Sequence, residues 1–271
     1  MALSSEPMGK LLGDVHNLVR AALATHQDVD GMELDANPKG DQTQQFDLAA
    51  ERCVERYLRH HAPPSVLLSE ESGELKLSEA PPEWCFILDP VDGSDNYARG
   101  LNLSGVCLAV LPAGAPLAVG NIEWALVGEL ERATPLLARR GGNAFRGDAR
   151  VLTSAVERIE DAFVSVELNH FSPLPALGVL LARARGVRSF GCASRALALV
   201  ATGALDAHVD IRNRLTAESF FAAALAVEEA GGCVVNSNGQ PLPSARDLTQ
   251  RFSLVAAATR RLADDIIEAL R

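Results

Sequence analysis

An apolar run that ends in a carboxylate-rich turn is the feature that most restricts how this chain folds. Residues 84–96 read WCFILDPVDGSDN. Short apolar runs bounded by turn residues are typical of buried strands, so we predict a strand over residues 84–88. Asp89 and Asp92 follow at the exit of this strand, and Pro90 between them stiffens the turn. The sequence therefore predicts two carboxylates at fixed positions beside a buried strand.

The turn itself has two interpretations. Gly93 lets the backbone approach a ligand closely, Ser94 can cap the segment that follows, and exposed N–H groups at such a turn suit a phosphate. Alternatively, Asp-Pro and Asp-Gly pairs are common in ordinary turns, where the carboxylates are solvated. This stretch alone leaves both interpretations open.

Composition limits the class of protein. The chain has 271 residues, enough for one large α/β domain or two modest ones, and its 48% hydrophobic and 22% charged residues exclude a disordered chain. A formal charge of −10 and a pI near 5.1 argue against a non-specific nucleic-acid binder, which needs a basic face. An acidic enzyme can still act on phosphorylated substrates if metal cations make the local field positive.

Cysteine usage and hydropathy predict a cytoplasmic protein without a membrane or nucleic-acid partner. The five cysteines are scattered and form no CxxC clip, as expected of reduced core thiols. The N-terminal stretch lacks the apolar core of a signal peptide, and each apolar run is interrupted too early to span a bilayer.

Periodicity predicts an N-terminal half with two helices and an antiparallel sheet. Apolar residues recur at helical spacing over residues 8–24 and 47–61, and the polar segment 26–45 between them is predicted to be a loop. The predicted strands are residues 65–69, 84–88, 105–111, 117–124 and 126–130.

The second half alternates predicted strands and helices, which favours a layered α/β arrangement. A soft boundary near residues 151–157 divides the chain into an N-terminal α+β half, 1–152, and a C-terminal α/β half, 153–271. The predicted strands are 162–168, 187–190, 206–211, 233–236 and 252–257, and the predicted helices are 174–185, 194–202, 217–230 and a C-terminal amphipathic helix.

Other acidic residues support a phosphoryl-transfer site. Glu70 and Glu71 follow the predicted strand 65–69, and Asp47 lies on the second helix with Thr43 shortly before it. Hard oxygen ligands of this kind suit Mg²⁺ or Mn²⁺ rather than zinc. Divalent cations of this kind activate water and neutralise a leaving phosphate. Each feature is weak alone, but together they indicate a phosphoryl hydrolase.

The chain resembles the inositol monophosphatase superfamily of Mg²⁺-dependent, lithium-sensitive phosphatases, and is closest in motif style to the archaeal and bacterial enzymes that also act on fructose 1,6-bisphosphate. The matching segments follow the family order along most of the chain. They are GDQTQQFDLAAE (40–51), LLSEESGE (67–74), WCFILDPVDGSDNYARG (84–100), RRGGNAFRGDARVLTS (139–154), FGCASRALALVATGALDAHVD (190–210) and AVEEAGG (226–232).

This resemblance implies a role for each matching residue. Glu70, Asp89 and the carbonyl of Val91 hold the first metal, and Asp89 and Asp92 share a second. Asp47 and Ser94 orient or deprotonate the attacking water, with Thr43 supporting Asp47. The backbone N–H groups of Gly93 and Ser94 receive the phosphate. The resemblance also implies a layered α-β-α-β-α sandwich, commonly assembled as a homodimer.

The chain departs from the family pattern at two places. Ser219 stands where the family has a further metal-binding Asp, which weakens the second metal site, and whether the neighbouring Glu218 replaces it is left open. Arg212 stands where animal inositol monophosphatases have a Glu that contacts ring hydroxyls. An arginine there favours an anionic group, although both Arg212 and Arg214 are alternatively surface residues.

These features together predict a Mg²⁺-dependent phosphomonoesterase in which Mn²⁺ can substitute. Its expected substrate is a small phosphorylated metabolite, such as an inositol monophosphate, a sugar phosphate or a bisphosphate. Two alternatives remain open. One is a 3′,5′-bisphosphate nucleotidase of the same superfamily. The other is a degenerate member that binds or regulates, because of Ser219.

Overall fold

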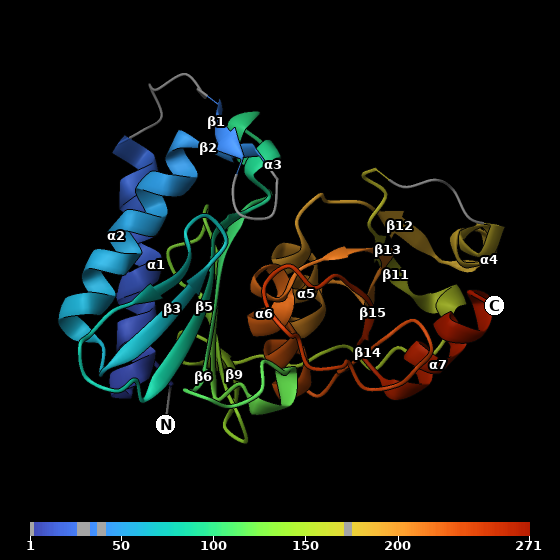
Figure 1. Ribbon diagram of the computed structural model, residues 1–271. Coiled ribbons are helices and arrows are strands. Elements are labelled where there is room, and N and C mark those ends of the chain that lie inside the picture. Colours follow the sequence, from blue (N-terminus) through green and yellow to red (C-terminus); the bar gives the residue numbers. More distant parts are fainter. Residues whose placement is uncertain (1–2, 26–32, 37–41, 171–174) are drawn as a thin grey trace.

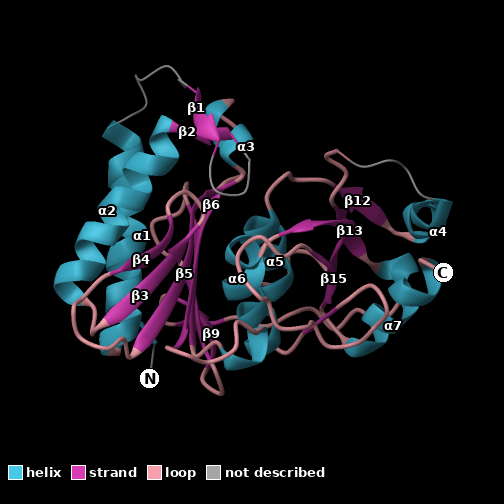
Figure 2. Ribbon diagram, viewed as in Figure 1, coloured by secondary structure: helices cyan, strands magenta, loops and turns pink. Residues whose placement is uncertain are grey.

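Helices and sheets alternate as five stacked layers (Figures 1 and 2). The structure is a computed structural model that describes residues 3–25, 33–36, 42–170 and 175–271. Helices α1 and α2 cover the outer face of the larger sheet, α5 and α6 lie between the two sheets, and α4 and α7 cover the smaller sheet. This order confirms the predicted α-β-α-β-α sandwich.

The larger sheet has eight strands and is antiparallel except where β3 and β5 run side by side in the same direction. The strand that includes Asp89 and Asp92 lies near one edge of this sheet. In spatial order its strands are β10 (Ala149–Arg150), β9 (Asn143–Arg146), β8 (Leu136–Arg139), β7 (Trp124–Glu129), β6 (Gly105–Pro112), β5 (Trp84–Asp92), β3 (Ser65–Ser69) and β4 (Gly73–Lys76).

Strand β5 is apolar on both faces because helices cover both sides of the sheet. Phe86 and Leu88 pack in the cluster under α1 and α2, whereas Cys85 and Ile87 pack in the cluster around α5 and α6. Successive side chains of a strand point to opposite faces, so two helical layers require the unbroken apolar run that the sequence shows.

The smaller sheet has five strands of mixed direction and supplies the other side of the molecule. Strand β11 runs parallel to both of its neighbours, and the remaining pairs are antiparallel. In spatial order the strands are β12 (Gly186–Arg188), β11 (Phe163–Val166), β13 (Ala207–Leu215), β15 (Phe252–Ala257) and β14 (Cys233–Val235). The alternation of strands and helices predicted for this half is confirmed.

The helices follow the predicted apolar spacing closely. They are α1 (Pro7–Thr25), α2 (Gln45–His61), α3 (Ser94–Ala98), α4 (Pro175–Arg183), α5 (Ala193–Ala201), α6 (Ala217–Glu229) and α7 (Arg260–Ala269), with 3-10 turns η1 (Leu3–Ser5), η2 (Val119–Asn121) and η3 (Ile159–Asp161). Short α3 begins directly after the carboxylate turn and was not predicted.

One predicted strand is wrong, and several short strands were missed. Residues 117–124 do not form a strand: η2 lies within them, with Asn121 N–H donating to the Ala118 carbonyl and the Asn121 side chain donating to Pro116. Val119 and Ile122 are buried by this turn and not by strand pairing in a sheet.

The predicted loop 26–45 contains a small sheet of β1 (Glu33–Ala36) and β2 (Gln42–Gln44).

Helix α6 joins the two halves of the chain. Its side chains belong to one hydrophobic cluster with residues of the larger sheet and with β15. At its end, Glu229 accepts hydrogen bonds from the N–H groups of Gly141 (2.8 Å) and Asn143 (2.9 Å) in the β8–β9 hairpin. The sheets change between Arg150 and Phe163, but the predicted division at residue 152 stays a prediction.

Candidate active site

A cavity of about 240 Å³ lies where the ends of several strands and helices meet. One side consists of the end of β5, the two residues after it, and Glu70 after β3. The other side consists of β13, the first turn of α6 and a few loop residues. The lining residues are Glu70, Asp89, Val91, Asp92, Gly93, Ser94, Glu167, Asn169, Gly191, Cys192, Ala193, Arg212, Arg214, Leu215, Thr216, Ser219 and Arg251.

The parallel pairing of β3 and β5 brings the predicted acidic residues to one place. Ser69 lies opposite Leu88 in the register, and the N–H of Glu70 donates to the Leu88 carbonyl at 3.1 Å. Because the two strands run in the same direction, Glu70, which follows the end of β3, comes next to Asp89 of β5. Neither sequence segment alone indicates this pairing.

Strand β5 runs further than predicted and includes the turn. The ladder with β6 continues to Asp92 across an irregularity after Asp89. Asp89 is buried, and its Oδ1 accepts the N–H of Val91 at 3.1 Å. The acidic residues are therefore built into the end of a strand, and the interpretation as an ordinary solvated turn does not hold for Asp89.

Asp92 is held by the C-terminal half of the chain. Its Oδ2 accepts the N–H of Ser194 at 2.6 Å and the thiol of Cys192 at 3.1 Å. Burial raises the pKa of Asp92 to about 6, with a further contribution from Glu70, while the hydrogen bonds from Ser194 oppose the shift. Sequence reasoning missed both partners, because nothing in GCASRAL marks a contact with residue 92.

Gly93 has a steric reason to be glycine. Its φ is +83°, and a Cβ there would lie 3.0 Å from the Cβ of Cys192 and 3.1 Å from the Leu103 carbonyl. Any other residue would be strained at this φ and crowded by those neighbours.

The next turn is anchored to the other half of the chain by Asn96, whose amide donates to the Phe190 carbonyl at 2.6 Å.

Asp47 contacts Ser94, which lines the cavity, but Asp47 itself is not one of the described lining residues. The Ser94 hydroxyl lies 3.2 Å from Asp47 Oδ1 and 2.9 Å from the Val91 carbonyl, and Asp47 Oδ2 accepts the N–H of Gln44 at 3.3 Å. Asp47 is only 2% exposed. Burial, then the charges of Glu71 and Glu70, raise the pKa of Asp47 to about 8. The side chain of Thr43, expected to support this pair, lies outside the described residues.

The carboxylates share one cavity but are not gathered around one point. Among the residues that the structure describes, no three His, Cys, Asp or Glu side chains are grouped closely enough to hold a metal ion. The expected cluster of Glu70, Asp89 and Asp92 is therefore not found as a ready-made ion site. All three line the same cavity, and Asp92 is turned toward Ser194 and Cys192.

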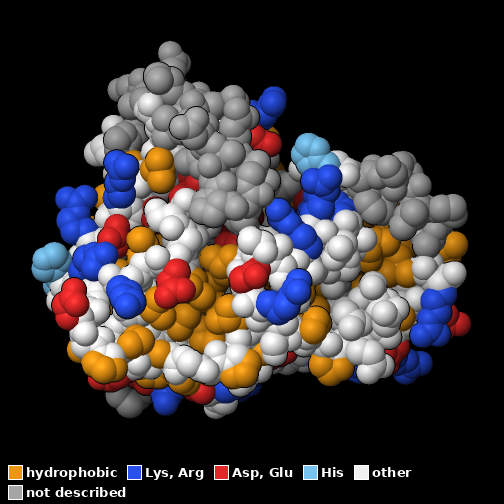
Figure 3. Space-filling view, viewed as in Figure 1, with side chains coloured by type: hydrophobic (Ala, Val, Ile, Leu, Met, Phe, Trp, Pro, Cys, Tyr) orange, Lys and Arg blue, Asp and Glu red, His pale blue; other side chains and the backbone are white. Residues whose placement is uncertain are grey.

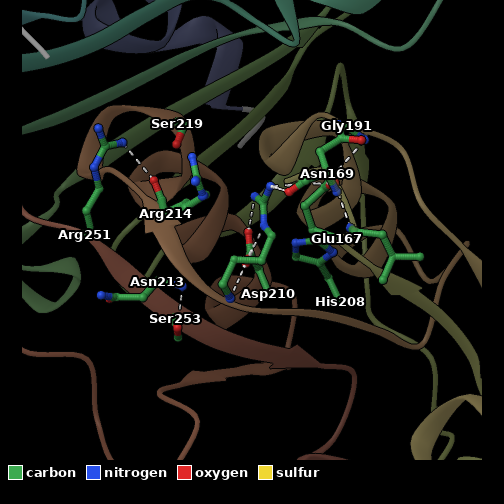
Figure 4. Close-up of polar contacts among 12 residues, drawn as sticks. Glu167, Asn169, Gly191, His208, Asp210, Asn213, Arg214, Ser219, Arg251 and Ser253 are labelled. Carbon is green, nitrogen blue, oxygen red and sulfur yellow. Dashed lines mark hydrogen bonds and ion pairs between the residues drawn. The ribbon is translucent and has the colours of Figure 1, made fainter. Parts of the chain in front are cut away.

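Arg212 lines the cavity, but its charge is already balanced. Its Nε and Nη2 donate to the two oxygens of the fully buried Asp210 at 2.9 and 2.6 Å, and its Nη1 donates to the Asn169 carbonyl at 2.8 Å (Figure 4). Glu167 lies next to this pair and accepts the N–H groups of Asn169 and Gly191. The guanidinium thus fixes the cavity wall, and its expected contact with an anionic group stays a prediction.

Two further arginines line the cavity. Arg214 is exposed, and Arg251 donates from Nη1 to the Arg214 carbonyl at 2.9 Å (Figure 4). Arg214 follows Arg212 by two residues, and this strand spacing was the available signal that both share one face. Arg251 precedes β15, and no sequence signal places it here.

Ser219 also lines this side of the cavity. Its hydroxyl donates to the Thr216 carbonyl at 2.9 Å, within the first turn of α6. Glu218 is buried and is not one of the described residues that line the cavity. Its replacement of the missing Asp stays a prediction.

Comparison with known proteins places the chain in a family. The profile of the inositol monophosphatase family matches residues 10–271. The chain belongs to the inositol monophosphatase family. This confirms the resemblance seen in the motifs, and the family is one of phosphatases.

Named relatives of two kinds match over most of their length. The chain is 29% identical over 238 residues to a fructose-1,6-bisphosphatase/inositol-1-monophosphatase of Methanothermobacter thermautotrophicus, covering 85% of this chain and 84% of the relative. It is 30% identical over 231 residues to a putative Nus factor SuhB of Neisseria meningitidis, covering 82% of each.

Solved structures agree with the family assignment. An extragenic suppressor protein suhB from Bartonella henselae has a TM-score of 0.79 at 26% identity, with 98% of this chain and 97% of that chain covered. An inositol monophosphatase from Anabaena has a TM-score of 0.77 at 21% identity, with 96% and 94% covered, and supports the fold alone. Within the described ranges, none of the helices has the length and apolar character needed to cross a bilayer.

Proposed function

We propose that this chain is a divalent-metal-dependent phosphomonoesterase that hydrolyses a small phosphorylated metabolite. The observation that carries the proposal is the buried Asp47–Ser94 contact beside a cavity with Glu70 and Asp89 on its wall. A carboxylate with a hydroxyl at 3.2 Å is the kind of pair that positions water and takes its proton. Family membership supports this chemistry.

The donors on the acidic side fit one hard cation better than two. Glu70, Asp89 and the carbonyl of Val91 all line the cavity and are oxygen donors of the kind that Mg²⁺ and Mn²⁺ prefer. When bound, such a cation supplies positive charge that offsets these carboxylates, acidifies water and stabilises the charge that develops on a phosphate. The donors for a second cation are poorer, because Asp92 already accepts a hydrogen bond from Ser194 and the Ser219 side chain is neutral.

In this proposal the chain's own residues position the reactants. In its ionised form Asp47 accepts a proton from water through its contact with Ser94; with a pKa of about 8 this form is the minority at neutral pH until a bound cation lowers that pKa. The turn at Gly93 and Ser94 faces the phosphate. Arg212 holds the opposite wall through Asp210. Phosphoryl transfer depends mainly on positioning and charge stabilisation, so a fixed cavity of this kind suits it.

A phosphate-release assay tests the proposal. Inositol 1-phosphate, fructose 1,6-bisphosphate and a 3′,5′-bisphosphonucleotide are compared at increasing Mg²⁺ or Mn²⁺. We expect release from at least one, and loss of release in chelator. D47N should lower kcat by a factor of about 10²–10⁴ if Asp47 is the base, while D148N, an exposed control, should not change it. No release from any substrate at high Mg²⁺ would contradict the proposal.

A second candidate function is binding or regulation without catalysis. Ser219 favours it, since a neutral hydroxyl replaces a carboxylate that the family resemblance implies, and a relative is named as a putative Nus factor. The S219D variant discussed below separates the two functions. The 3′,5′-bisphosphate nucleotidase shares the chemistry of the first proposal and is distinguished by the substrate panel. A homodimer in the cytoplasm remains a prediction from the resemblance and the composition.

A further inference from the structure

The cavity has two sides of opposite charge. Glu70, Asp89 and Asp92 line one side, and Arg212, Arg214 and Arg251 line the other, together with Glu167 and the neutral Thr216 and Ser219. On the face shown in Figure 3, Lys and Arg side chains gather beside the middle of the molecule, toward the smaller sheet. The acidic side suits a cation, so the basic side suits an anion.

The three arginines are not equivalent. Arg212 has its Nε and Nη2 on Asp210, which is fully buried, so its charge is compensated inside the protein. Arg214 is exposed, and no carboxylate among the described residues forms an ion pair with it. The cavity therefore contains a guanidinium whose natural counter-ion is not supplied by the described part of the chain.

Arg251 and Arg214 are held next to each other. The Nη1 of Arg251 donates to the carbonyl of Arg214 at 2.9 Å, and both residues are on the cavity wall (Figure 4). Pairing of Leu215 with Phe252 keeps the two chain segments in register. Guanidinium groups bind an anion with several oxygens through several N–H groups, so two arginines on one wall of the cavity favour such an anion.

Ser219 adds no carboxylate to this side of the cavity, where Glu167 is the acidic lining residue beside Arg212. Its hydroxyl donates to the Thr216 carbonyl, and both residues line the cavity beside Arg214. An acidic residue at 219 would offset the arginine charge and repel an anion. With serine there, no negative charge is added at position 219.

We propose that Arg214, with Arg251 beside it, forms a phosphate-binding subsite that holds a phosphate group of the substrate directly, without a metal ion. This inference rests on the proposed function only in naming the substrate. Arginine binds phosphate oxygens through several N–H groups, which gives such a subsite both affinity and orientation.

Binding of inorganic phosphate in the presence of chelator tests the subsite. The Tm is measured in EDTA with phosphate and with chloride at equal ionic strength, and the dissociation constant follows from the stabilisation. We expect phosphate to raise the Tm of the unmodified chain. R214Q and R251Q should weaken phosphate binding at least about tenfold, R214K should weaken it less, and R150Q, an exposed control outside the cavity, should leave it unchanged.

The outcomes separate this inference from the proposed function. Metal-free phosphate binding that R214Q and R251Q leave unchanged overturns the subsite, even if the chain hydrolyses phosphate esters. Binding that depends on Arg214 supports the subsite even if no ester is hydrolysed. The Tm without phosphate shows whether each variant is folded.

Substrate kinetics identify which phosphate occupies the subsite. If it holds a second phosphate of a bisphosphate, R214Q raises KM for the bisphosphate and leaves the kinetics of a monophosphate unchanged. If it holds the phosphate that is transferred, R214Q lowers kcat for both. Either result supports the subsite, and equal kinetics of R214Q and the unmodified chain on both substrates contradict it.

Discussion

At the scale of single residues, Asp89 and Asp92 differ because of the partners that the fold gives them. Asp89 accepts the N–H of Val91 within its own turn, whereas Asp92 accepts from Ser194 and Cys192 on the other half of the chain. The two carboxylates look alike in the sequence, where they flank Pro90 and Val91. Asp92 thus helps to hold the two halves together.

Ser219 is the residue whose replacement best separates catalysis from binding. In S219D, a carboxylate enters the cavity beside Arg214, so we expect a lower Mg²⁺ requirement and faster turnover if the chain is an enzyme with a weakened second metal site. The same charge should weaken phosphate binding in EDTA. Phosphate release against Mg²⁺ concentration and the number of Mn²⁺ ions bound per chain measure both effects.

The matched control is S237D, which adds the same charge in the turn after β14, away from the cavity. It should change neither measurement. No gain in activity or in bound Mn²⁺ for S219D favours the binding or regulatory function instead.

At the scale of elements, α1 is attached to the larger sheet through a buried histidine. His16 is fully buried, its Nε2 lies 3.3 Å from the carbonyl of Glu129, and a Cβ on Gly128 would lie 2.3 Å from its ring. Burial lowers the pKa of His16 to about 4. Glycine at 128 is therefore required by the close approach of the ring to β7.

This histidine makes stability depend on pH. The unfolded chain protonates His16 near pH 6.5, whereas the folded chain does so only near pH 4, so the unfolded state binds more protons between these values. Stability due to neutral His16 is full above pH 6.5 and is lost as the pH falls. From pH 7 to pH 5 we expect His16 to contribute a loss of about 2 kcal/mol, against which the raised pKa values of Asp47 and Asp92 act in the opposite direction.

Urea unfolding at both pH values measures this loss. H16N, which does not titrate, should lose less stability between pH 7 and pH 5 than the unmodified chain. H170Q, at an exposed histidine, should lose as much as the unmodified chain. An equal loss in H16N would show that His16 is not the group responsible.

At the scale of the whole molecule, α6 and the segment before α5 connect the two sheets across the cavity. Asp92 accepts the N–H of Ser194 in the first turn of α5, Asn96 donates to Phe190 before that helix, and Glu229 accepts from the β8–β9 hairpin. Arg195 on α5 also pairs with the buried Glu129 of β7 at 2.7 Å. The position of each side of the cavity thus depends on contacts between distant parts of the chain.

Glu229 provides a test of this connection. E229Q replaces one carboxylate oxygen with an N–H₂ group that faces a backbone N–H, so we expect it to lower the free energy of unfolding by about 1–3 kcal/mol. E228Q breaks only a partly exposed ion pair with Arg140 and should lower it by less than about 1 kcal/mol. Urea midpoints measure both, and equal losses would contradict the role of Glu229.

Much of the fold and part of the site were predictable because they depend on the pattern of neighbouring residues in the sequence. Residues close together in the sequence are enough to predict the apolar run of β5 and the acidic residues at its end. The same holds for the helical spacing of α1, α2 and α7. Family motifs assigned the expected roles of Asp47, Glu70, Asp89 and Ser94. The strand expected at 117–124 was wrong because a run of apolar residues is buried equally well by a 3-10 turn.

The sequence by itself determined the acidic turn and most helices and strands, since these depend on residue types at short spacing. Its six motifs carried the family resemblance, which in turn implied the layered fold. Tertiary structure alone decided that Asp92 is bound by Ser194, that Asp210 balances Arg212, and that Arg214 and Arg251 meet beside Ser219. Those contacts join residues from separate strands, helices and loops. Their distances depend on how the two sheets pack across α5 and α6, which no local pattern encodes.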